Sequence, residues 1–328
     1  MNIAVLGCGG MGRKIANALR QMRDAGEDIR LYAAASRDLQ KAKAFCEAEE
    51  FEIAYGSYEE MLSDPNVDLV HVCTPHSHHF EHTKLCFEYG KPALVEKTFT
   101  TNARQARELV RLSREKNLLL AEAIWTRYMP SRQIIADLIA DGTLGDIQYV
   151  TGNLHYPMLD KSRILDPELA GGALMDVGIY PVHYAAMFLG TDYERMDVSV
   201  QWLETGVDRQ ETISFYYPNG CMAELSAGAA IRSDRRGLIA GTKGYLEIVN
   251  INDPEKLTLY LAEDGWTQPH DIPLPPQQTG YEYQIRACQK ALAEGWIECP
   301  EMPHAEIIRI MEVMDDIRAR IGLTFPCE

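Results

Sequence analysis

Asp176 and Tyr180 lie four residues apart in an otherwise apolar stretch, residues 171–180, and their types and spacing suggest chemistry. In a helix this spacing places both side chains on one face. A single carboxylate beside a single phenol favours proton transfer over metal binding. The alternative is a packed helix start, with the acid near the positive end of the helix dipole and the tyrosine ring buried.

Glu96 and Lys97 form a second polar pair, directly after the apolar residues 93–95. Those apolar residues predict a strand, and a lysine at the carboxyl end of a parallel strand stands where such sheets bind ligands. A surface lysine paired with the neighbouring glutamate is the simpler interpretation of these two residues alone. We expect the two polar pairs to converge from separate domains on one cleft, a usual place for a substrate.

A glycine-rich turn with the spacing G-x-G-x-x-G covers residues 7–12, directly after the first predicted strand. Glycines permit a tight turn and a close approach of the backbone to a pyrophosphate at a helix N-terminus. The turn lies in the strand–turn–helix context that this function requires. We therefore predict dinucleotide binding by Gly7, Gly9, Gly10, Met11 and Gly12.

Ser36 and Arg37 follow the second predicted strand, where a site for an unphosphorylated ribose usually has Asp or Glu. An arginine offers a planar fork for a 2′-phosphate, and the serine adds a hydroxyl donor. The alternative is that Arg37 is a solvated residue at a helix start. The sequence predicts NADP as the cofactor, with NAD as the second choice.

Short apolar runs alternate with amphipathic helical segments in the first half of the chain. The runs are residues 3–6, 29–35, 51–55, 69–73, 93–95 and 118–121. This alternation predicts a parallel sheet with helices on both faces. Together with the glycine turn, it predicts an α/β Rossmann domain with a doubly wound parallel sheet over residues 1–121.

The pattern changes after Pro130. A helix at 132–140 and a strand at 147–155 precede the segment of Asp176 and Tyr180, and from residue 195 the predicted strands follow one another. Successive strands without intervening helices predict a large, mostly antiparallel sheet. We expect an α+β domain for substrate binding and dimerisation over residues 122–328, with its last helix packed back on the first domain.

Composition narrows the class of protein. The chain has 328 residues, 46% of them hydrophobic, and a formal net charge of -16. This length favours two domains. The acidic charge, without a local basic patch, argues against nucleic-acid and anionic-membrane partners. Because the first residues lead into a strand without an export signal, and no stretch has membrane-spanning length, we expect a cytoplasmic protein.

The eight cysteines include no Cys-x-x-Cys pair, and we expect reduced, buried thiols. The one group that suggests zinc is Cys73 with His76, His78, His79 and His82. These residues lack a matching ligand pair further along the chain, so we expect no metal.

The chain resembles the glucose-fructose oxidoreductase, inositol 2-dehydrogenase and related (Gfo/Idh/MocA) family over essentially its whole length. The resemblance rests on the glycine turn, Thr74-Pro75 with His79, Glu96-Lys97 and the segment Asp176-x-Gly178-x-Tyr180. Longer stretches are most similar to the branch of dimeric dihydrodiol dehydrogenases, which also act as D-xylose dehydrogenases with NADP. These stretches are residues 122–127, 142–146, 204–208, 241–244 and 321–326.

The resemblance implies further site residues. For the cofactor they are Thr74, Pro75, His76, His79, Glu96, Lys97, Trp125 and Arg127. For the substrate they are Lys97, Trp125, His155, Asp176 and Tyr180, with Arg127 and Tyr156 as weaker candidates for the substrate wall. Aromatic residues at domain junctions usually pack, so Trp125 and Tyr156 also have a structural interpretation.

Four positions depart from the family pattern. Thr98 replaces the usual proline after the lysine, which predicts a less rigid loop. His76 replaces a common asparagine near the nicotinamide. Tyr180 stands where many members have histidine, and Tyr184 where many have aspartate. The tyrosine form is typical of the dihydrodiol and glucose-fructose branches, which favours xylose- and dihydrodiol-type substrates over inositol.

The resemblance implies an oxidoreductase that moves a hydride between a nicotinamide and a carbinol of a sugar, polyol or cyclic trans-diol. The hydroxyl proton must then go to a base. A tyrosine has an ordinary pKa of about 10, so it needs a nearby cation to accept a proton at neutral pH. We expect Tyr180 to be the general acid/base, Lys97 its electrostatic partner and Asp176 the orienting group. The roles of Lys97 and Tyr180 could be exchanged.

Two other functions stay open. An NAD-linked inositol or aldose dehydrogenase would use the same chemistry. A non-catalytic dinucleotide-sensing regulator would not, and the presence of Lys97, Asp176 and Tyr180 together argues against it. The resemblance also implies a homodimer or higher homo-oligomer, formed through the sheet of the second domain.

Overall fold

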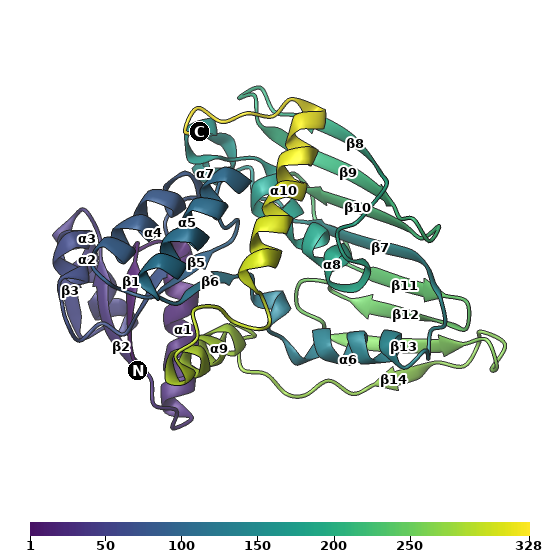
Figure 1. The fold of residues 1–328 in the computed structure, drawn as a ribbon, viewed down its shortest axis with the longest axis horizontal. Helices are drawn as coiled ribbons and strands as arrows, with labels where there is room; N and C mark the ends of the chain where they lie inside the picture. Colours follow the sequence, from purple (N-terminus) through teal and green to yellow (C-terminus); the bar gives the residue numbers. More distant parts are fainter. The chain divides into compact units, whose positions relative to one another are not determined.

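The computed structural model describes residues 1–328, whose contacts group into two compact units (Figure 1). The first unit comprises Met1–Tyr128 and Gln277–Met311, and the second comprises Met129–Pro276 and Glu312–Glu328. Each unit is built around its own sheet. The predicted fold class, a doubly wound parallel sheet followed by a large and mostly antiparallel sheet, is confirmed.

The first unit holds a six-stranded sheet in the order β3-β2-β1-β4-β5-β6, with every pair parallel. Its strands are β1 (Asn2–Leu6), β2 (Arg30–Ala35), β3 (Ile53–Tyr55), β4 (Leu69–Val72), β5 (Ala93–Glu96) and β6 (Leu120–Ala123). The central strands are mostly apolar and almost entirely buried, as strands covered on both faces require. The strand order reverses between β1 and β4, and this fold binds ligands beyond the carboxyl ends of the strands at such a reversal.

Helices connect these strands. They are α1 (Gly10–Asp24), α2 (Leu39–Glu49), α3 (Tyr58–Leu62), α4 (His79–Glu88) and α5 (Ala103–Lys116), with α9 (Glu282–Glu294) packed beside α1. From β1 the chain moves toward one edge of the sheet, and from β4 it moves toward the other edge. Because parallel crossovers are right-handed, α1 and α2 therefore lie on one face of the sheet and α4 and α5 on the other. Helix α10 (His304–Ile321) begins in the first unit and ends in the second.

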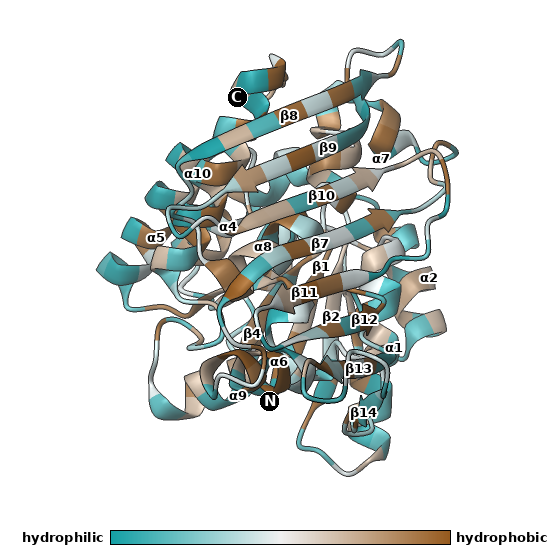
Figure 2. Cartoon of the chain, turned by 90° about the vertical axis from the view of Figure 1, so that its right-hand side faces the viewer, coloured by the Kyte–Doolittle hydropathy of each residue, from teal (hydrophilic) through white to brown (hydrophobic).

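The second unit holds an eight-stranded sheet in the order β14-β13-β12-β11-β7-β10-β9-β8, in which only β7 and β10 are parallel. Its strands are β7 (Ile147–His155), β8 (Arg195–Trp202), β9 (Asp208–Tyr216), β10 (Met222–Gly228), β11 (Gly237–Gly241), β12 (Gly244–Val249), β13 (Lys256–Leu261) and β14 (His270–Ile272). Its helices include α6 (Pro130–Ala140), α7 (Ser162–Leu165) and α8 (Ile179–Leu189). Helix α8 packs on β7 and β10, whereas no helix crosses the opposite face of the sheet (Figure 2).

Tyr184 explains how α8 approaches the sheet. Gly152 of β7 and Gly237 of β11 are register partners, and a Cβ at either glycine would lie within 3.0 Å of the Tyr184 ring or hydroxyl. The tyrosine therefore fills the space that two strand side chains would otherwise need. It is fully buried, which raises the pKa of its phenol. Tyr184 is thus a packing residue.

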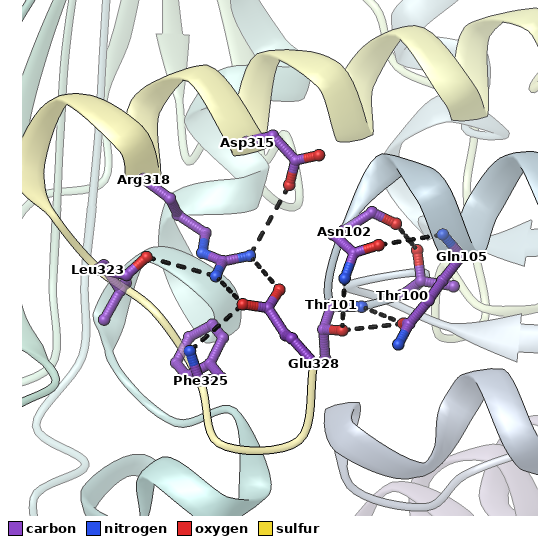
Figure 3. Close-up of polar contacts among 9 residues, drawn as sticks. All are labelled: Thr100, Thr101, Asn102, Gln105, Asp315, Arg318, Leu323, Phe325 and Glu328. Atoms are coloured by element: carbon purple, nitrogen blue, oxygen red, sulfur yellow. Dashed lines mark hydrogen bonds and ion pairs between the residues drawn. The ribbon is translucent and has the colours of Figure 1, made fainter.

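The last residues of the chain fold back onto α10. The Arg318 guanidinium donates to both carboxylate oxygens of Glu328, at 2.8 and 2.6 Å, and to the carbonyl oxygen of Leu323 at 3.3 Å (Figure 3). The Phe325 ring lies 4.5 Å from the same guanidinium. This buried arginine therefore anchors the C-terminal segment within the second unit.

All eight cysteines are free thiols, and seven of them are buried, in agreement with the expectation of reduced, core-packed cysteines. No helix combines the length and apolar character that crossing a membrane would require.

Candidate active site

Two glycines of the glycine turn pack closely against the rest of the protein, whereas two others have free space beside them. Gly7 has φ +112°, and a Cβ there would lie 3.1 Å from the Cys73 backbone. A Cβ at Gly12 would lie 2.9 Å from the Gly7 carbonyl oxygen. In contrast, a Cβ at Gly9 or Gly10 would meet nothing within 4 Å. These glycines therefore leave a cradle beside the backbone at the start of α1.

The first turn of α1 has no side-chain cap, because its N-cap residue is Gly9. The first backbone N–H groups of a helix lack partners inside the helix and carry the positive end of its dipole. Such an end binds phosphate groups well when the backbone can be approached closely. The cradle has the open backbone that a pyrophosphate would need, and dinucleotide binding by residues 7–12 stays a prediction.

Arg37 borders a pocket of about 520 Å³ beyond the end of β2. Ser57, Tyr58, His82 and Leu85 are among its other lining residues, together with Gly56, Glu59, Glu81 and Glu88. Burial, with smaller contributions from His78, His79 and Arg37, lowers the pKa of His82 to about 4. His82 is therefore neutral at pH 7, which leaves Arg37 as the permanent cation of this pocket.

Ser36 and Asp38 shape the turn that carries Arg37. The Asp38 carboxylate accepts hydrogen bonds from the backbone N–H groups of Gln40 and Lys41 and so caps α2. The Ser36 hydroxyl oxygen accepts one from the Asp38 backbone N–H at 3.3 Å. Because Asp38 is engaged at the helix start, Arg37 is the side chain of this turn that borders the pocket.

His79 joins the loop after β4 to the loop after β5. Its Nδ1 lies 2.8 Å from the Thr98 carbonyl oxygen, and its Nε2 lies 2.8 Å from the Thr74 carbonyl oxygen. Thr74 Oγ1 also lies 2.9 Å from His82 Nδ1. Pro75 caps a short 3-10 helix (His76–His78) between these contacts. The predicted cofactor residues Thr74, Pro75, His76 and His79 therefore form one connected loop.

Thr98, which stands in place of the family proline, is held by contacts of its own. Thr98 is fully buried, its carbonyl oxygen is held by His79, and the Lys97–Thr98 peptide bond is cis. Burial and this hydrogen bond fix the backbone next to the lysine. These contacts hold Thr98 in place, and the lower rigidity expected of a loop without the proline stays a prediction.

Glu96, the neighbour of Lys97, is held from β4. His71 Nε2 lies 2.9 Å from Glu96 Oε1, and both side chains are buried. With Cys73 they form a group whose possible ligand atoms lie within 4.8 Å of one another. Burial raises the pKa of the Cys73 thiol well above its usual range, whereas metals bind the thiolate. Within this group the described contact is the His71–Glu96 hydrogen bond, which holds the residue next to Lys97.

Trp125 and Arg127 lie on a 3-10 helix (Trp125–Arg127) after β6. The indole of Trp125 stacks on the Tyr281 ring, with 4.4 Å between centroids, and its buried Nε1 has no acceptor. Arg127 is buried and donates to Glu306 Oε1 at 2.8 Å. The face of Trp125 is therefore used in packing, while its buried N–H donor has no protein acceptor.

Asp176 lies on a π-helical segment (Leu174–Gly178), and Tyr180 lies on the first turn of α8, which continues from it. Asp176 is buried and accepts a 2.9 Å hydrogen bond from Arg163 Nη2. Tyr180 is half-buried. The sequence predicted the helix but missed both the π-helical start and Arg163, since no periodicity links α7 to the carboxylate.

His155 ends β7, where its Nε2 lies 3.1 Å from the Ser226 hydroxyl oxygen. Burial lowers the pKa of the imidazole, so the ring is neutral at pH 7, and its buried Nδ1 has no partner. The Tyr156 backbone N–H donates to the Gly228 carbonyl oxygen at 3.1 Å. Lys97 belongs to the first unit, whereas His155, Asp176 and Tyr180 belong to the second.

Two family models match the chain. One, described as an oxidoreductase family with an NAD-binding Rossmann fold, matches residues 1–123, and the other, the C-terminal domain of the GFO/IDH/MocA family, matches residues 133–247. The human trans-1,2-dihydrobenzene-1,2-diol dehydrogenase is 33% identical over 303 residues, which cover 90% of this chain and 89% of that protein. The enzyme of the same name from Xenopus laevis is 32% identical over 91% of this chain and 92% of that protein.

Solved structures share the fold at lower identity. The aldose-aldose oxidoreductase of Caulobacter crescentus has a TM-score of 0.86 at 21% identity, covering 98% of this chain and 97% of that one. The 3-ketoreductase KijD10 of Actinomadura kijaniata, solved with NADP, has a TM-score of 0.84 at 24% identity and covers 97% of both chains. With both domain models matched and an identity above 30% over nine-tenths of its length, this chain belongs to the Gfo/Idh/MocA family of NAD(P)-binding oxidoreductases.

Proposed function

We propose that the protein is an NADP-dependent dehydrogenase that oxidises one carbinol of a cyclic trans-diol or of a sugar such as D-xylose. The observation that carries this proposal is the 33% identity with human trans-1,2-dihydrobenzene-1,2-diol dehydrogenase over 90% of the chain. The cradle at Gly9 and Gly10 supports nicotinamide cofactor binding independently. When bound, the nicotinamide supplies the hydride acceptor or donor.

The proton is the part of the reaction that this chain must handle itself. We assign it to Tyr180, whose phenol is half-buried at the start of α8. Lys97 supplies the positive charge that favours a phenolate, and Asp176 orients the lysine or a substrate hydroxyl. These roles follow from the chemistry of the three side chains and from the family resemblance. Trp125 and His155, each with a buried nitrogen that lacks a partner, are assigned to the ligand-binding walls.

An activity screen tests the proposal directly. The protein is incubated with NADP and, in turn, D-xylose, D-glucose, myo-inositol and a trans-dihydrodiol, and NADPH formation is followed. Tyr180→Phe is expected to lower kcat by roughly 100-fold or more, because general acid/base groups contribute 10²–10⁴-fold. Tyr89→Phe, a change at an exposed tyrosine of the first unit, is the matched control. A Tyr180→Phe enzyme with near-normal turnover would refute the assignment of Tyr180.

Lys97→Met separates the role of the lysine from cofactor binding. If Lys97 acts on the phenol, its loss lowers kcat more than it weakens NADP binding. A variant that loses only NADP affinity would instead show a cofactor contact. If Tyr180→Phe loses its turnover of a substrate but Lys97→Met keeps it, Lys97 is not the proton-transfer group.

The preference for NADP rests on Arg37, the permanent cation of the pocket beyond β2. Three glutamates, Glu59, Glu81 and Glu88, also line this pocket, so we expect a moderate preference. Arg37→Ala is expected to weaken NADP binding and leave NAD binding nearly unchanged. Equal affinities of the unaltered protein for both cofactors would contradict the assignment and favour the NAD-linked alternative.

We further propose that the protein is a homo-oligomer formed through the uncovered face of the second sheet. The strand register places one continuous row of side chains across seven strands on this face: Arg195, Tyr216, Met222, Tyr149, Ala240, Tyr245 and Tyr260. Tyr245 stacks on Tyr260 at 4.7 Å and on Trp266 at 6.1 Å, measured between ring centroids. Aromatic side chains on an uncovered sheet face are typical of interfaces.

Tyr245→Asp tests this interface, because it places a charge in the centre of the aromatic row. The measured quantity is the molar mass in solution by light scattering, and Tyr89→Asp in the first unit is the control. A monomeric unaltered protein would overturn the proposal. The eight free cysteines support a reducing compartment, and we propose the cytoplasm, which cell fractionation can test.

A further inference from the structure

Two carboxyl groups of β9 lie buried beneath the segment that carries Asp176. Asp208 and Glu211 have exposed fractions of 0% and 1%. Residues three apart on a regular strand point to opposite faces. Here a β-bulge shifts the register, because Gln201 and Trp202 of β8 are adjacent while their partners Gln210 and Asp208 are not. The extra residue, Arg209, is exposed, and the bulge turns Asp208 to the same buried face as Glu211.

Both carboxyl groups contact the π-helical segment. The Leu174 backbone N–H donates to Asp208 Oδ2 at 2.5 Å. A Cβ at Gly172 would overlap Asp208 Oδ1, and a Cβ at Gly178 would overlap Glu211 Oε1. The two glycines therefore leave room for the carboxyl groups on either side of the segment, and the segment cannot shift toward β9 without meeting them.

We propose that Asp208 and Glu211 form a buried carboxyl pair that positions the π-helical segment, and with it Asp176 and Tyr180, so that both are positioning residues for the reaction. The inference rests on the proposed function of Asp176 and Tyr180. The pair does not touch the reacting atoms. It fixes the backbone from Leu174 to Gly178, and α8 with Tyr180 continues from that backbone.

One shared proton makes the pair stable in the interior. Burial raises the pKa of Glu211 well above its usual range, and the charge of Asp208 adds to this effect. Burial also raises the pKa of Asp208, but backbone N–H groups and the hydrogen bond from Glu211 oppose the increase. The increase at Glu211, together with the backbone N–H groups that hold Asp208, favours Glu211 as the protonated donor and Asp208 as the acceptor. This arrangement places one negative charge in the core, where two adjacent charges would repel strongly.

The same proton accounts for two of three carboxyl oxygens that have no other partner, one on each residue. Asp208 Oδ1 and both oxygens of Glu211 are buried and meet no N–H or hydroxyl donor. Buried polar atoms without a hydrogen bond are costly, and native proteins retain few of them. A carboxylic acid that donates to its neighbour reduces this cost. Glutamine has the same shape and also donates, whereas leucine fills the space but cannot donate.

The experiment compares Glu211→Gln with Glu211→Leu, each loaded with NADP. Hydrogen–deuterium exchange of the peptide covering residues 171–180 is measured together with kcat, KM and NADP affinity. We expect the leucine variant to exchange faster in this peptide and to lose roughly 10- to 100-fold in kcat, since small misplacements of catalytic groups cost up to this much. NADP affinity should stay unchanged, and the glutamine variant should retain at least half of the kcat.

Gly178→Ala reaches the same contact from the other side, because its Cβ displaces the Glu211 carboxyl group. Gly178→Ala replaces Glu211→Leu in the experiment if the leucine variant does not fold. We expect the same faster exchange in residues 171–180 and the same lower kcat. Glu115→Gln, at an exposed glutamate of α5 in the first unit, is the control and should change neither. Exchange and kcat at unaltered levels in Glu211→Leu or Gly178→Ala would overturn the inference. If the unaltered protein turns over none of the substrates, the proposed function is refuted. Hydrogen–deuterium exchange requires no substrate, so it still tests whether Asp208 and Glu211 position the segment.

Discussion

Arg163 Nη2 donates to Asp176 Oδ2 at 2.9 Å and so binds the carboxylate to which the proposed reaction assigns an orienting role. Asp176 is 8% exposed, whereas the Arg163 side chain is 44% exposed. The buried Asp176 carboxylate is thus held by an arginine whose side chain is partly exposed. Arg163 comes from α7, and Ile164 next to it packs with Ala173 and Ala229 in a small apolar cluster. This cluster fixes the helix from which the arginine extends.

Arg163→Met is expected to lower kcat/KM by up to roughly fivefold, because a partly exposed ion pair contributes about 1 kcal/mol at most. The reason is that Asp176 loses the donor that fixes its rotamer. Lys161→Met is the matched control, since Lys161 lies two residues before Arg163 and pairs with the exposed Asp160 at 2.8 Å. Steady-state kinetics of both variants decide the matter, and equal losses would show that the effect is not specific to Asp176.

Trp125→Phe removes one hydrogen-bond donor and keeps an aromatic ring for stacking on Tyr281. If the buried Nε1 donates to a bound ligand, the Kd or KM of that ligand rises roughly fivefold, the value of one hydrogen bond of about 1 kcal/mol. Titrations with NADP and with substrate identify which ligand is affected. Trp296→Phe, at an exposed tryptophan, is the control. Unchanged affinity for both ligands would assign Trp125 to packing alone.

Metal removal is expected to leave the protein unaffected. His71, Cys73 and Glu96 provide possible ligand atoms within 4.8 Å of one another, but the thiol is held neutral by burial and His71 is hydrogen-bonded to Glu96. Dialysis against a chelator should change neither the melting temperature nor the activity, and metal analysis of the purified protein should find less than one equivalent. A chelator-dependent loss of stability, reversed by zinc, would contradict this expectation.

The sequence predicted the parts of the fold that depend on local pattern. The apolar runs of the first half are β1 to β6, and the closely spaced runs after residue 195 form the mostly antiparallel sheet. Strand order could not be predicted in this way, because it depends on contacts between residues far apart in the chain. The parallel pairing of β7 with β10 inside an otherwise antiparallel sheet is one example.

The candidate site shows the same division. The close packing at Gly7 and Gly12 agrees with the glycine spacing in the sequence, because a tight backbone turn requires that spacing. Arg163 and the carboxyl pair of Asp208 and Glu211 leave no such spacing, since they reach Asp176 and its segment through tertiary contacts. The β-bulge at Arg209, which brings the pair onto one face, also breaks the alternation by which strand faces are predicted.

Glu122 should make stability depend on pH. It is fully buried on β6, and burial raises its pKa from 4.5 to about 8, with the nearby Arg127 opposing the increase. Between these two values the folded protein holds a proton that the unfolded chain has released. The stabilisation is therefore complete below about pH 4.5 and is lost as pH rises through about 8.

Glu122→Gln removes this titration while keeping the shape of the side chain. Urea unfolding at several pH values from 5 to 8 is expected to show a smaller loss of stability with rising pH in the variant than in the unaltered protein. Each pKa unit corresponds to about 1.36 kcal/mol, so the difference should reach a few kcal/mol in order of magnitude. Glu115→Gln, at an exposed glutamate of α5, should follow the unaltered protein. If the Glu122→Gln curve runs parallel to that of the unaltered protein, the carboxyl group is ionised in the fold, and burial does not control its protonation.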